Sequence, residues 1–222
     1  MTPAVPGWLD PLRAAVAKVR PQQLSRYLPP PEGGRDSAVL ILIGEGPGGP
    51  DVLLMRRADL LRSHAGQPAF PGGAADPGDG SPAGTALREA AEEVGVLADG
   101  VTVLAELPAL YLPPSGYVVT PVLAWWHTPS EVTAVDPGET ASVARVPISE
   151  LVDPANRFCS THPSGYVGPS FVVRDMLVWG FTAGLLDKVL TLGGWTLPWN
   201  ADDVRELPAD VVALAVGPGQ RG

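Results

Sequence analysis

The chain has 222 residues, 45% of them hydrophobic and 18% charged, which is enough to bury one substantial core and too few charges for a disordered polyelectrolyte. The net charge of −9 argues against a general nucleic-acid-binding protein, because phosphate neutralisation needs a basic surface that 15 Lys and Arg against 24 Asp and Glu cannot easily supply. The single cysteine, Cys159, excludes an internal disulfide and fits a cytoplasmic location.

Residues 1–35 are predicted to form an N-terminal helix and a linker. Apolar residues recur at helical spacing over residues 8–20, namely Trp8, Leu12, Val16 and Val19. Pro and Gly then dominate residues 29–34, as is typical of a linker. No basic stretch precedes an apolar segment at the N-terminus, and no run reaches the roughly 20 apolar residues that span a bilayer, so we expect neither secretion nor a membrane partner.

Residues 36–192 are predicted to form the main domain. Two apolar runs, 38–43 and 52–55, flank a turn-rich segment and predict a β-hairpin. A loop-like region rich in Gly and Pro follows, and then a helix over residues 82–94 that Gly95 ends. The remaining predicted elements are strands at 101–107, 117–126, 142–146 and 171–178 and a helix at 179–190. This order indicates an α/β sandwich with a mixed sheet, followed by a C-terminal extension over 193–222.

Three carboxylates share one edge of the predicted helix over 82–94. Each helical residue advances by about 100°, so Glu89, Glu92 and Glu93 fall within roughly 100° of one another. The one cation of this helix, Arg88, is placed to pair with Glu92 at i+4. Clustered oxygen ligands select hard divalent ions such as Mg²⁺ or Mn²⁺. The alternative is an ordinary solvated acidic face.

A Gly- and Pro-rich motif precedes this helix. Phe70–Gly73 is followed by fourteen residues and then by Arg88–Val96. Together they resemble a Nudix box, whose general form is G-x5-E-x7-R-E-U-x-E-E-x-G-U with U apolar, and the second half matches at every fixed position. The first half departs, because the general signature places Gly at Ala74 and Glu at Gly80. Counted forward from the motif's last Gly, the sixth residue is the acid Asp79, which implies one extra residue between loop and helix.

The motif with this extra residue resembles that of one branch of the Nudix family, the coenzyme A pyrophosphatase-like branch. The upstream pattern of this branch is L-L-T-x-R-[SA]-x3-R-x3-G-x3-F-P-G-G. The chain matches this pattern at Leu53, Leu54, Arg57, Ala58, Arg62, Gly66 and Phe70–Gly73. Met55 stands in place of the Thr. The resemblance runs from about residue 38 to residue 190. It includes Trp179, for which a core position is the alternative.

The resemblance implies a Nudix-type α/β/α sandwich with a mixed sheet and assigns roles to the box residues. It implies that Glu89 and Glu93 hold Mg²⁺ or Mn²⁺, that Glu92 ligates or supports a second ion, and that Arg88 orients Glu89. In the family, the general base is often an acid on a loop across from the helix, and Glu139 is the candidate here. The predicted catalytic residues are thus Glu92, Glu139 and Arg88. For Glu139 the alternative is a solvated turn residue, since it follows Asp-Pro-Gly.

The substrate-binding candidates lie just before the box: Arg57, Arg62, His64, Gly72 and Gly73. Arginine suits phosphate because its planar fork can bind two oxygens, and glycine lets the backbone approach a ligand. One alternative is that Arg57, together with its neighbour Arg56, caps a strand end. A second is that Arg62 pairs with Asp59, and a third is that His64 is structural.

The resemblance to this branch implies hydrolysis of coenzyme A or acyl-CoA to adenosine 3′,5′-bisphosphate and (acyl-)4′-phosphopantetheine. A second possibility is a Nudix diphosphatase for another nucleoside diphosphate derivative, such as NADH or ADP-ribose. A third is a sensor that binds a nucleotide without cleaving it, although a binding module need not keep a cluster of mutually repelling acids. The expected partner is a small nucleotide rather than a nucleic acid. A homodimer is a further possibility.

Overall fold

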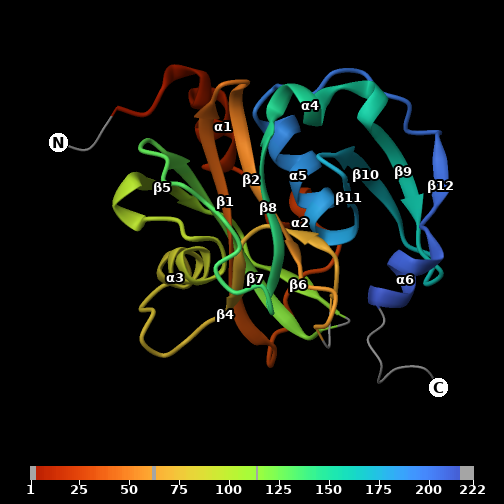
Figure 1. The fold of residues 1–222 in the computed structure, drawn as a ribbon, viewed down its shortest axis with the longest axis horizontal. Helices are drawn as coiled ribbons and strands as arrows, with labels where there is room; N and C mark the ends of the chain where they lie inside the picture. Colours follow the sequence, from red (N-terminus) through yellow and green to blue (C-terminus); the bar gives the residue numbers. More distant parts are fainter. Residues whose placement is uncertain (1–3, 62–63, 114, 216–222) are drawn as a thin grey trace.

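The computed structural model describes residues 4–61, 64–113 and 115–215. Its larger sheet contains the long strands β1 (Arg35–Gly46), β2 (Gly49–Arg57), β5 (Val101–Glu106), β7 (Tyr117–Trp126) and β8 (Thr140–Pro147), with the short β6 (Leu110–Leu112). β1 and β2 form the predicted antiparallel hairpin, and β8 lies antiparallel along β2. β7 runs parallel to β1, whereas β5 and β6 run antiparallel to β7. The sheet is therefore mixed, as predicted (Figure 1).

β1 and β2 pair only beside their turn and then diverge. Their register ends where Ile43 lies opposite Val52. The segment after β2 fills the gap, because β3 (Pro68–Ala69) pairs with β2 and β4 (Gly72–Ala74) pairs with β1. The Gly- and Pro-rich motif of the sequence thus enters the middle of the sheet.

Helix α3 (Pro82–Val94) covers one face of this sheet (Figure 1). It packs on alternate residues of the central strands, which include Leu40, Leu42, Leu53, Met55, Val122 and Ala124. The intervening residues of the same strands face a second core shared with α1 (Asp10–Val16) and α5 (Gly180–Leu192). Helices on both faces of a mixed sheet confirm the predicted α/β/α sandwich.

A second, smaller sheet contains β9 (Arg157–Thr161), β10 (Val167–Val173), β11 (Met176–Val178) and β12 (Val204–Glu206). The prediction of one strand over 171–178 is wrong, because β10 and β11 form a hairpin there. Its turn residues, Arg174 and Asp175, both have positive φ, at 49° and 59°. Asn and Gly usually occupy such a turn, so the Arg-Asp pair carried no turn signal. β12 lies in the C-terminal extension and pairs in parallel with β9.

The N-terminal residues pack onto the main domain. Leu9 and Leu12, from the 3-10 turn η1 (Gly7–Leu9) and from α1, are fully buried in the core shared with α5. The ring of Trp8 meets that of Trp125 edge-on, with centroids 5.6 Å apart. A helix is therefore present in this region and packs against the core, but it is shorter than the predicted 8–20, because α1 ends at Val16.

The remaining helices are short: α2 (Pro21–Leu24), η2 (Ala98–Gly100), α4 (Ile148–Val152), η3 (Pro154–Asn156) and α6 (Ala209–Ala215). Within the described ranges, no helix is long and apolar enough to cross a membrane.

Local signals determine both ends of α3. The side chain of Ser81 accepts a hydrogen bond from the backbone N of Gly84 at 3.1 Å, and Pro82 occupies the first helical position. Gly95 follows the helix in the left-handed region with φ 76°, and its N–H donates to the last turn. The predicted bounds 82–94 and the stop at Gly95 are confirmed.

We predict that Gly84→Ala destabilises the protein. Helix propensity favours Ala by about 1 kcal/mol, but the added Cβ would overlap the backbone carbonyl oxygen of Asp79. Overpacking costs about 1–3 kcal/mol, so the free energy of unfolding in urea should fall. Gly78→Ala is the matched control, because nothing lies within 4 Å of its added Cβ. Equal stability of the two variants would contradict the prediction.

Candidate active site

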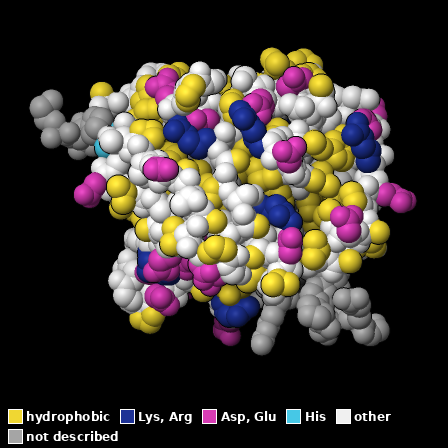
Figure 2. All heavy atoms as spheres, viewed as in Figure 1, with side chains coloured by type: hydrophobic (Ala, Val, Ile, Leu, Met, Phe, Trp, Pro, Cys, Tyr) yellow, Lys and Arg dark blue, Asp and Glu magenta, His cyan; other side chains and the backbone are white. Residues whose placement is uncertain are grey.

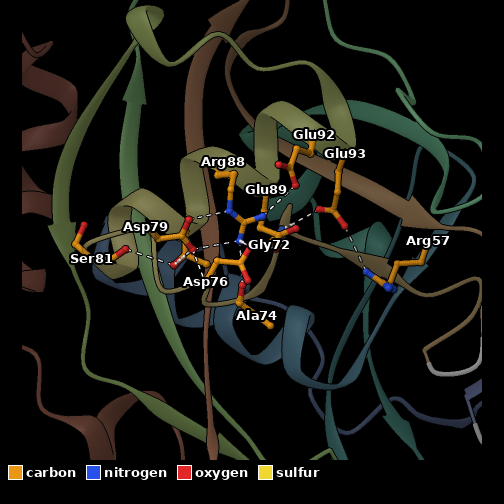
Figure 3. A network of polar contacts seen from close by, with 11 residues as sticks. Arg57, Gly72, Ala74, Asp76, Asp79, Ser81, Arg88, Glu89, Glu92 and Glu93 are labelled. Carbon is orange, nitrogen blue, oxygen red and sulfur yellow. Dashed lines mark hydrogen bonds and ion pairs between the residues drawn. The ribbon is translucent and has the colours of Figure 1, made fainter.

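Glu93 has the most buried carboxylate on the edge of α3, with its side chain 5% exposed. It faces the place where β3 and β4 enter the sheet. Its carboxylate accepts a hydrogen bond from the backbone N of Gly72 at 2.9 Å and lies 3.5 Å from Nη1 of Arg57 (Figure 3). One carboxylate therefore joins α3 to the glycine loop and to the end of β2.

Two glycines allow this close approach of loop and helix. A Cβ at Gly72 would lie 2.7 Å from the Cα of Val39, inside the neighbouring strand. A Cβ at Gly73 would overlap the carboxylate of Glu89. A side chain at Gly72 would push the loop away from β1, and one at Gly73 would displace the carboxylate of Glu89. The structure thus places Gly72 and Gly73 against the carboxylates, and their contact with substrate stays a prediction.

Arg88 is the centre of a second network on the same helix (Figure 3). Its Nε donates to Asp79 at 2.8 Å, and its Nη2 donates to the carbonyl oxygen of Ala74 at 3.0 Å. The guanidinium also lies 3.0 Å from a carboxylate oxygen of Glu89 and donates to Glu92 at 3.0 Å. The predicted i+4 pairing with Glu92 is therefore present, and Arg88 is placed to orient Glu89.

Asp79, the acid six residues after the last Gly of the motif, closes the loop onto the helix. Besides its bonds with Arg88, it accepts hydrogen bonds from the hydroxyl of Thr85 and from the backbone N of Asp76, both at 2.8 Å. These contacts, with Arg88 the largest, hold the pKa of Asp79 well below its usual range. The bond to Asp79 likewise raises the pKa of Arg88. Thr85 carried no signal in the sequence, because an isolated helical Thr is unremarkable.

Burial dominates the electrostatics of the two inner carboxylates. It raises the pKa of Glu93 to about 7, because desolvation outweighs the contacts with Gly72 and Arg57. Burial also raises the pKa of Glu89, against the opposing charge of Arg88. The neighbouring groups thus compensate only part of the cost of burying the negative charges of Glu89 and Glu93.

This donor set fits a hard divalent cation, because it consists of carboxylate oxygens whose mutual repulsion a cation would relieve. Among the residues that the structure describes, no three acidic, His or Cys side chains converge as a ready-made metal cluster. Glu92 is 60% exposed and held by Arg88, and Glu93 is turned toward Gly72. Glu89 and Glu93 are the two more buried acids of this edge. To bind an ion, their carboxylates would have to leave their present contacts with Arg88 and Gly72.

The expected positive cluster is only partly assembled at the site. Arg57 contacts Glu93, so it does more than cap the end of its strand. Its neighbour Arg56 pairs with Asp59, and Nδ1 of His64 lies 3.1 Å from the side-chain oxygen of Gln67. Arg62 lies outside the described residues. Of the described basic candidates, Arg57 is therefore the one joined to the carboxylates.

Glu139 lies in a turn that faces the acidic edge of α3. Its backbone N donates to the carbonyl of Asp136 at 3.0 Å, and its own carbonyl accepts from the N of Ala58 at 2.8 Å. The turn is thus tied to the residue after Arg57. The negative charge of Glu139 contributes to the raised pKa of both Glu89 and Glu93. Its side chain therefore acts on the same electrostatic environment as the box acids.

We predict that Glu93 makes the stability of the metal-free protein depend on pH. Its pKa is about 7 when folded against an ordinary value of 4.5, so between these values the folded chain keeps a proton that the unfolded chain has lost. The free energy of unfolding should therefore fall as pH rises through this window and level off above about pH 7.

Urea unfolding in EDTA across this pH range measures the effect, and Glu93→Gln is the control because it cannot titrate. The difference between the parent and this variant isolates Glu93 from the other acids. Parallel stability curves for the two proteins would show that Glu93 does not carry a raised pKa.

Comparisons with known proteins agree with this architecture. The NUDIX domain model matches residues 34–163. An "Uncharacterized Nudix hydrolase NudL" from Photorhabdus laumondii is 38% identical over 170 residues, covering 73% of this chain and 89% of that protein. A protein of the same description from Yersinia pestis (strain Pestoides F) is 41% identical over 157 residues, covering 68% and 76%.

A crystal structure of a NUDIX hydrolase from Nitrosomonas europaea shares the fold, with a TM-score of 0.50 at 15% identity, and covers 79% of this chain and 81% of that one. The family model spans more than half of the chain, and it includes the glycine loop, the acidic edge of α3 and the turn of Glu139. The chain belongs to the Nudix hydrolase family.

Proposed function

We propose that this Nudix hydrolase cleaves the diphosphate bond of coenzyme A or acyl-CoA in the presence of Mg²⁺ or Mn²⁺. The observation that carries the proposal is the junction of Glu93, Gly72 and Arg57. There a buried acid, which would bind a cation, lies next to an arginine, which would bind phosphate. A metal-bound diphosphate would fit between these two kinds of group.

Arg57 is the described residue best suited to receive phosphate. Its side chain is partly exposed and its contact with Glu93 is long, at 3.5 Å, so the guanidinium keeps donor capacity for a phosphate. Figure 2 shows Lys and Arg side chains scattered among acidic ones on one face of the molecule. In a chain with a net charge of −9, a local arginine is needed to bring an anionic substrate to the acids.

The upstream pattern supports the coenzyme A branch. Its one mismatch, Met55, is fully buried between the sheet and α3. The sulfur of Met55 lies 3.7 Å from the hydroxyl of Thr140, a residue of the paired strand β8. A threonine is thus present beside position 55, supplied by the neighbouring strand. Because the position lies in the core, the mismatch changes packing rather than a surface that a substrate could touch.

The proposed reaction divides the work among named side chains. Glu89 and Glu93, supported by Glu92, would hold the metal, which when bound supplies positive charge to the diphosphate and lowers the pKa of water. Glu139 takes the proton of the attacking water as the water oxygen bonds to phosphorus and the bond from phosphorus to the bridging oxygen breaks. Arg57 binds the phosphate oxygens during this step.

We predict that Glu139→Gln slows turnover by roughly 100-fold to 10,000-fold, the range for loss of a general base, with KM little changed. The amide keeps the size of the side chain but cannot accept the proton. Steady-state kinetics at saturating Mg²⁺ measure the effect, and Glu131→Gln, on an exposed acid outside this turn, is the matched control. Unchanged turnover in Glu139→Gln would return the base to the acids of α3.

The substrate assignment is tested by its 3′-phosphate. With purified protein and Mg²⁺, we expect cleavage of coenzyme A, and a kcat/KM about ten-fold to 100-fold lower for dephospho-coenzyme A, as expected for loss of one charge-assisted hydrogen bond. Mass spectrometry of the products shows which bond is cut. Faster cleavage of NADH or ADP-ribose, with no preference for the 3′-phosphate, would replace coenzyme A by the broader diphosphatase activity.

A further inference from the structure

A cavity of about 180 Å³ lies beside β11, away from the acidic edge of α3. Its walls come from the loop before β3, from β11 and Trp179, and from α6. The last two of these walls lie beyond residues 34–163, the part that the family model matches. The cavity is therefore built partly by segments that the family model does not match.

The cavity and the candidate active site share the end of β2. Arg56 lines the cavity and Arg57 contacts Glu93, and adjacent strand residues point to opposite faces. The loop wall continues directly into the glycine motif, because Gln67 lines the cavity and its carbonyl accepts the backbone N of Arg57 at 3.0 Å. This backbone bond keeps the cavity next to the end of β2, on the other side of that strand from Glu93, so a ligand held by Arg57 would reach the cavity around this strand end.

The lining favours a neutral ligand. Apolar side chains form most of it, including Met176, Val211 and Leu214. The charged lining residues are Arg56, Asp175 and Asp210, and Arg56 is already neutralised by Asp59. The two remaining acids repel phosphate, although their oxygens can accept hydrogen bonds from amide N–H groups.

The ring of Trp179 gives the cavity a rigid wall. It is stacked on the ring of His162, with centroids 5.7 Å apart and an angle of 11° between the planes. The ring of His162 therefore restrains the indole from one of its faces. A flat apolar surface of this kind suits methylene and amide groups of a chain.

Size distinguishes between the two ends of the proposed substrate. Complete ligand pockets measure about 300–1,000 Å³, so 180 Å³ holds only part of a ligand. The adenosine end is bulky and carries the 3′-phosphate, which Asp175 and Asp210 disfavour. The pantetheine end is a slender, uncharged chain of amide and methylene groups.

We propose that this cavity binds the pantetheine arm of the substrate, and that the C-terminal extension, through α6, thereby contributes to substrate specificity. The proposal rests on the proposed function, which supplies the arm. It assigns a ligand-binding role to Val211 and Met176, which lie outside the Nudix box.

The test uses S-methylpantetheine, which has no phosphate and needs no catalysis to bind. The chain contains three methionines, Met1, Met55 and Met176, so methyl-labelled methionine gives a simple NMR spectrum. The Met176→Leu variant assigns the signal. We expect the Met176 methyl to shift in a saturable way and the Met55 methyl, which packs against the α3 side of the sheet, to stay in place.

Three variants sharpen this test. Val211→Trp fills the cavity and should abolish the Met176 shift, whereas Val211→Ala leaves room and should retain it. Val103→Trp is the matched control, because this partly exposed valine lies on β5, which pairs with β7 rather than with β2. In kinetics, Val211→Trp should raise KM for coenzyme A by roughly ten-fold, without a change in KM for ADP-ribose, which has no such arm.

The two proposals fail separately. A Met176 signal that stays unmoved while the protein cleaves coenzyme A overturns the cavity proposal and leaves the proposed function standing. A saturable Met176 shift without coenzyme A cleavage supports the cavity and overturns the function. An equal loss of the shift in Val211→Ala and Val211→Trp would also overturn the cavity proposal, because space would then not decide binding.

Discussion

The buried carboxylate of Glu93 is the constraint on which the site depends. β1 and β2 separate after a short paired stretch, and the segment that fills the gap brings the N–H of Gly72 to α3. Glu93 accepts that hydrogen bond and faces Arg57 on the other strand. Burying a carboxylate costs free energy. The hydrogen bond from Gly72 and the arginine at 3.5 Å offset this cost only in part, in line with the raised pKa of Glu93. A residue that gives up stability in this way is typical of a functional site.

Local signals made much of this architecture predictable. The bounds of α3 follow from Ser81, Pro82 and Gly95, which act within a few residues of where they stand in the chain. The acidic edge follows from helical geometry alone. The partners of Glu93 could not be predicted in the same way, because Gly72 and Arg57 lie 21 and 36 residues away and meet it only through the divergence of two strands. The hairpin of β10 and β11 was missed for a different reason, since its turn residues are unusual for their conformation.

The extra residue between the glycine loop and α3 alters the spacing while keeping the chemistry. Asp79 reaches Arg88 from the loop, and Arg88 in turn contacts Glu89 and Glu92. A carboxylate is therefore still available to orient the arginine although the general signature places its acid elsewhere. The loop accommodates this by passing close to α3 at Gly84, where a side chain would meet its backbone. Spacing in such a motif is a consequence of contacts, and different loop lengths can satisfy the same contacts.

The end of β2 lies between the acidic edge of α3 and the mainly apolar cavity. Arg57 points toward the acids of α3, and Arg56 points toward the cavity beside α6. The groups proposed to bind the diphosphate and the metal come from β2 and α3, within the residues that the family model matches. The apolar walls come from β11 and from the C-terminal extension. If the cavity binds part of the substrate, as proposed, substrate preference depends on segments that contribute none of Glu89, Glu93 and Arg57.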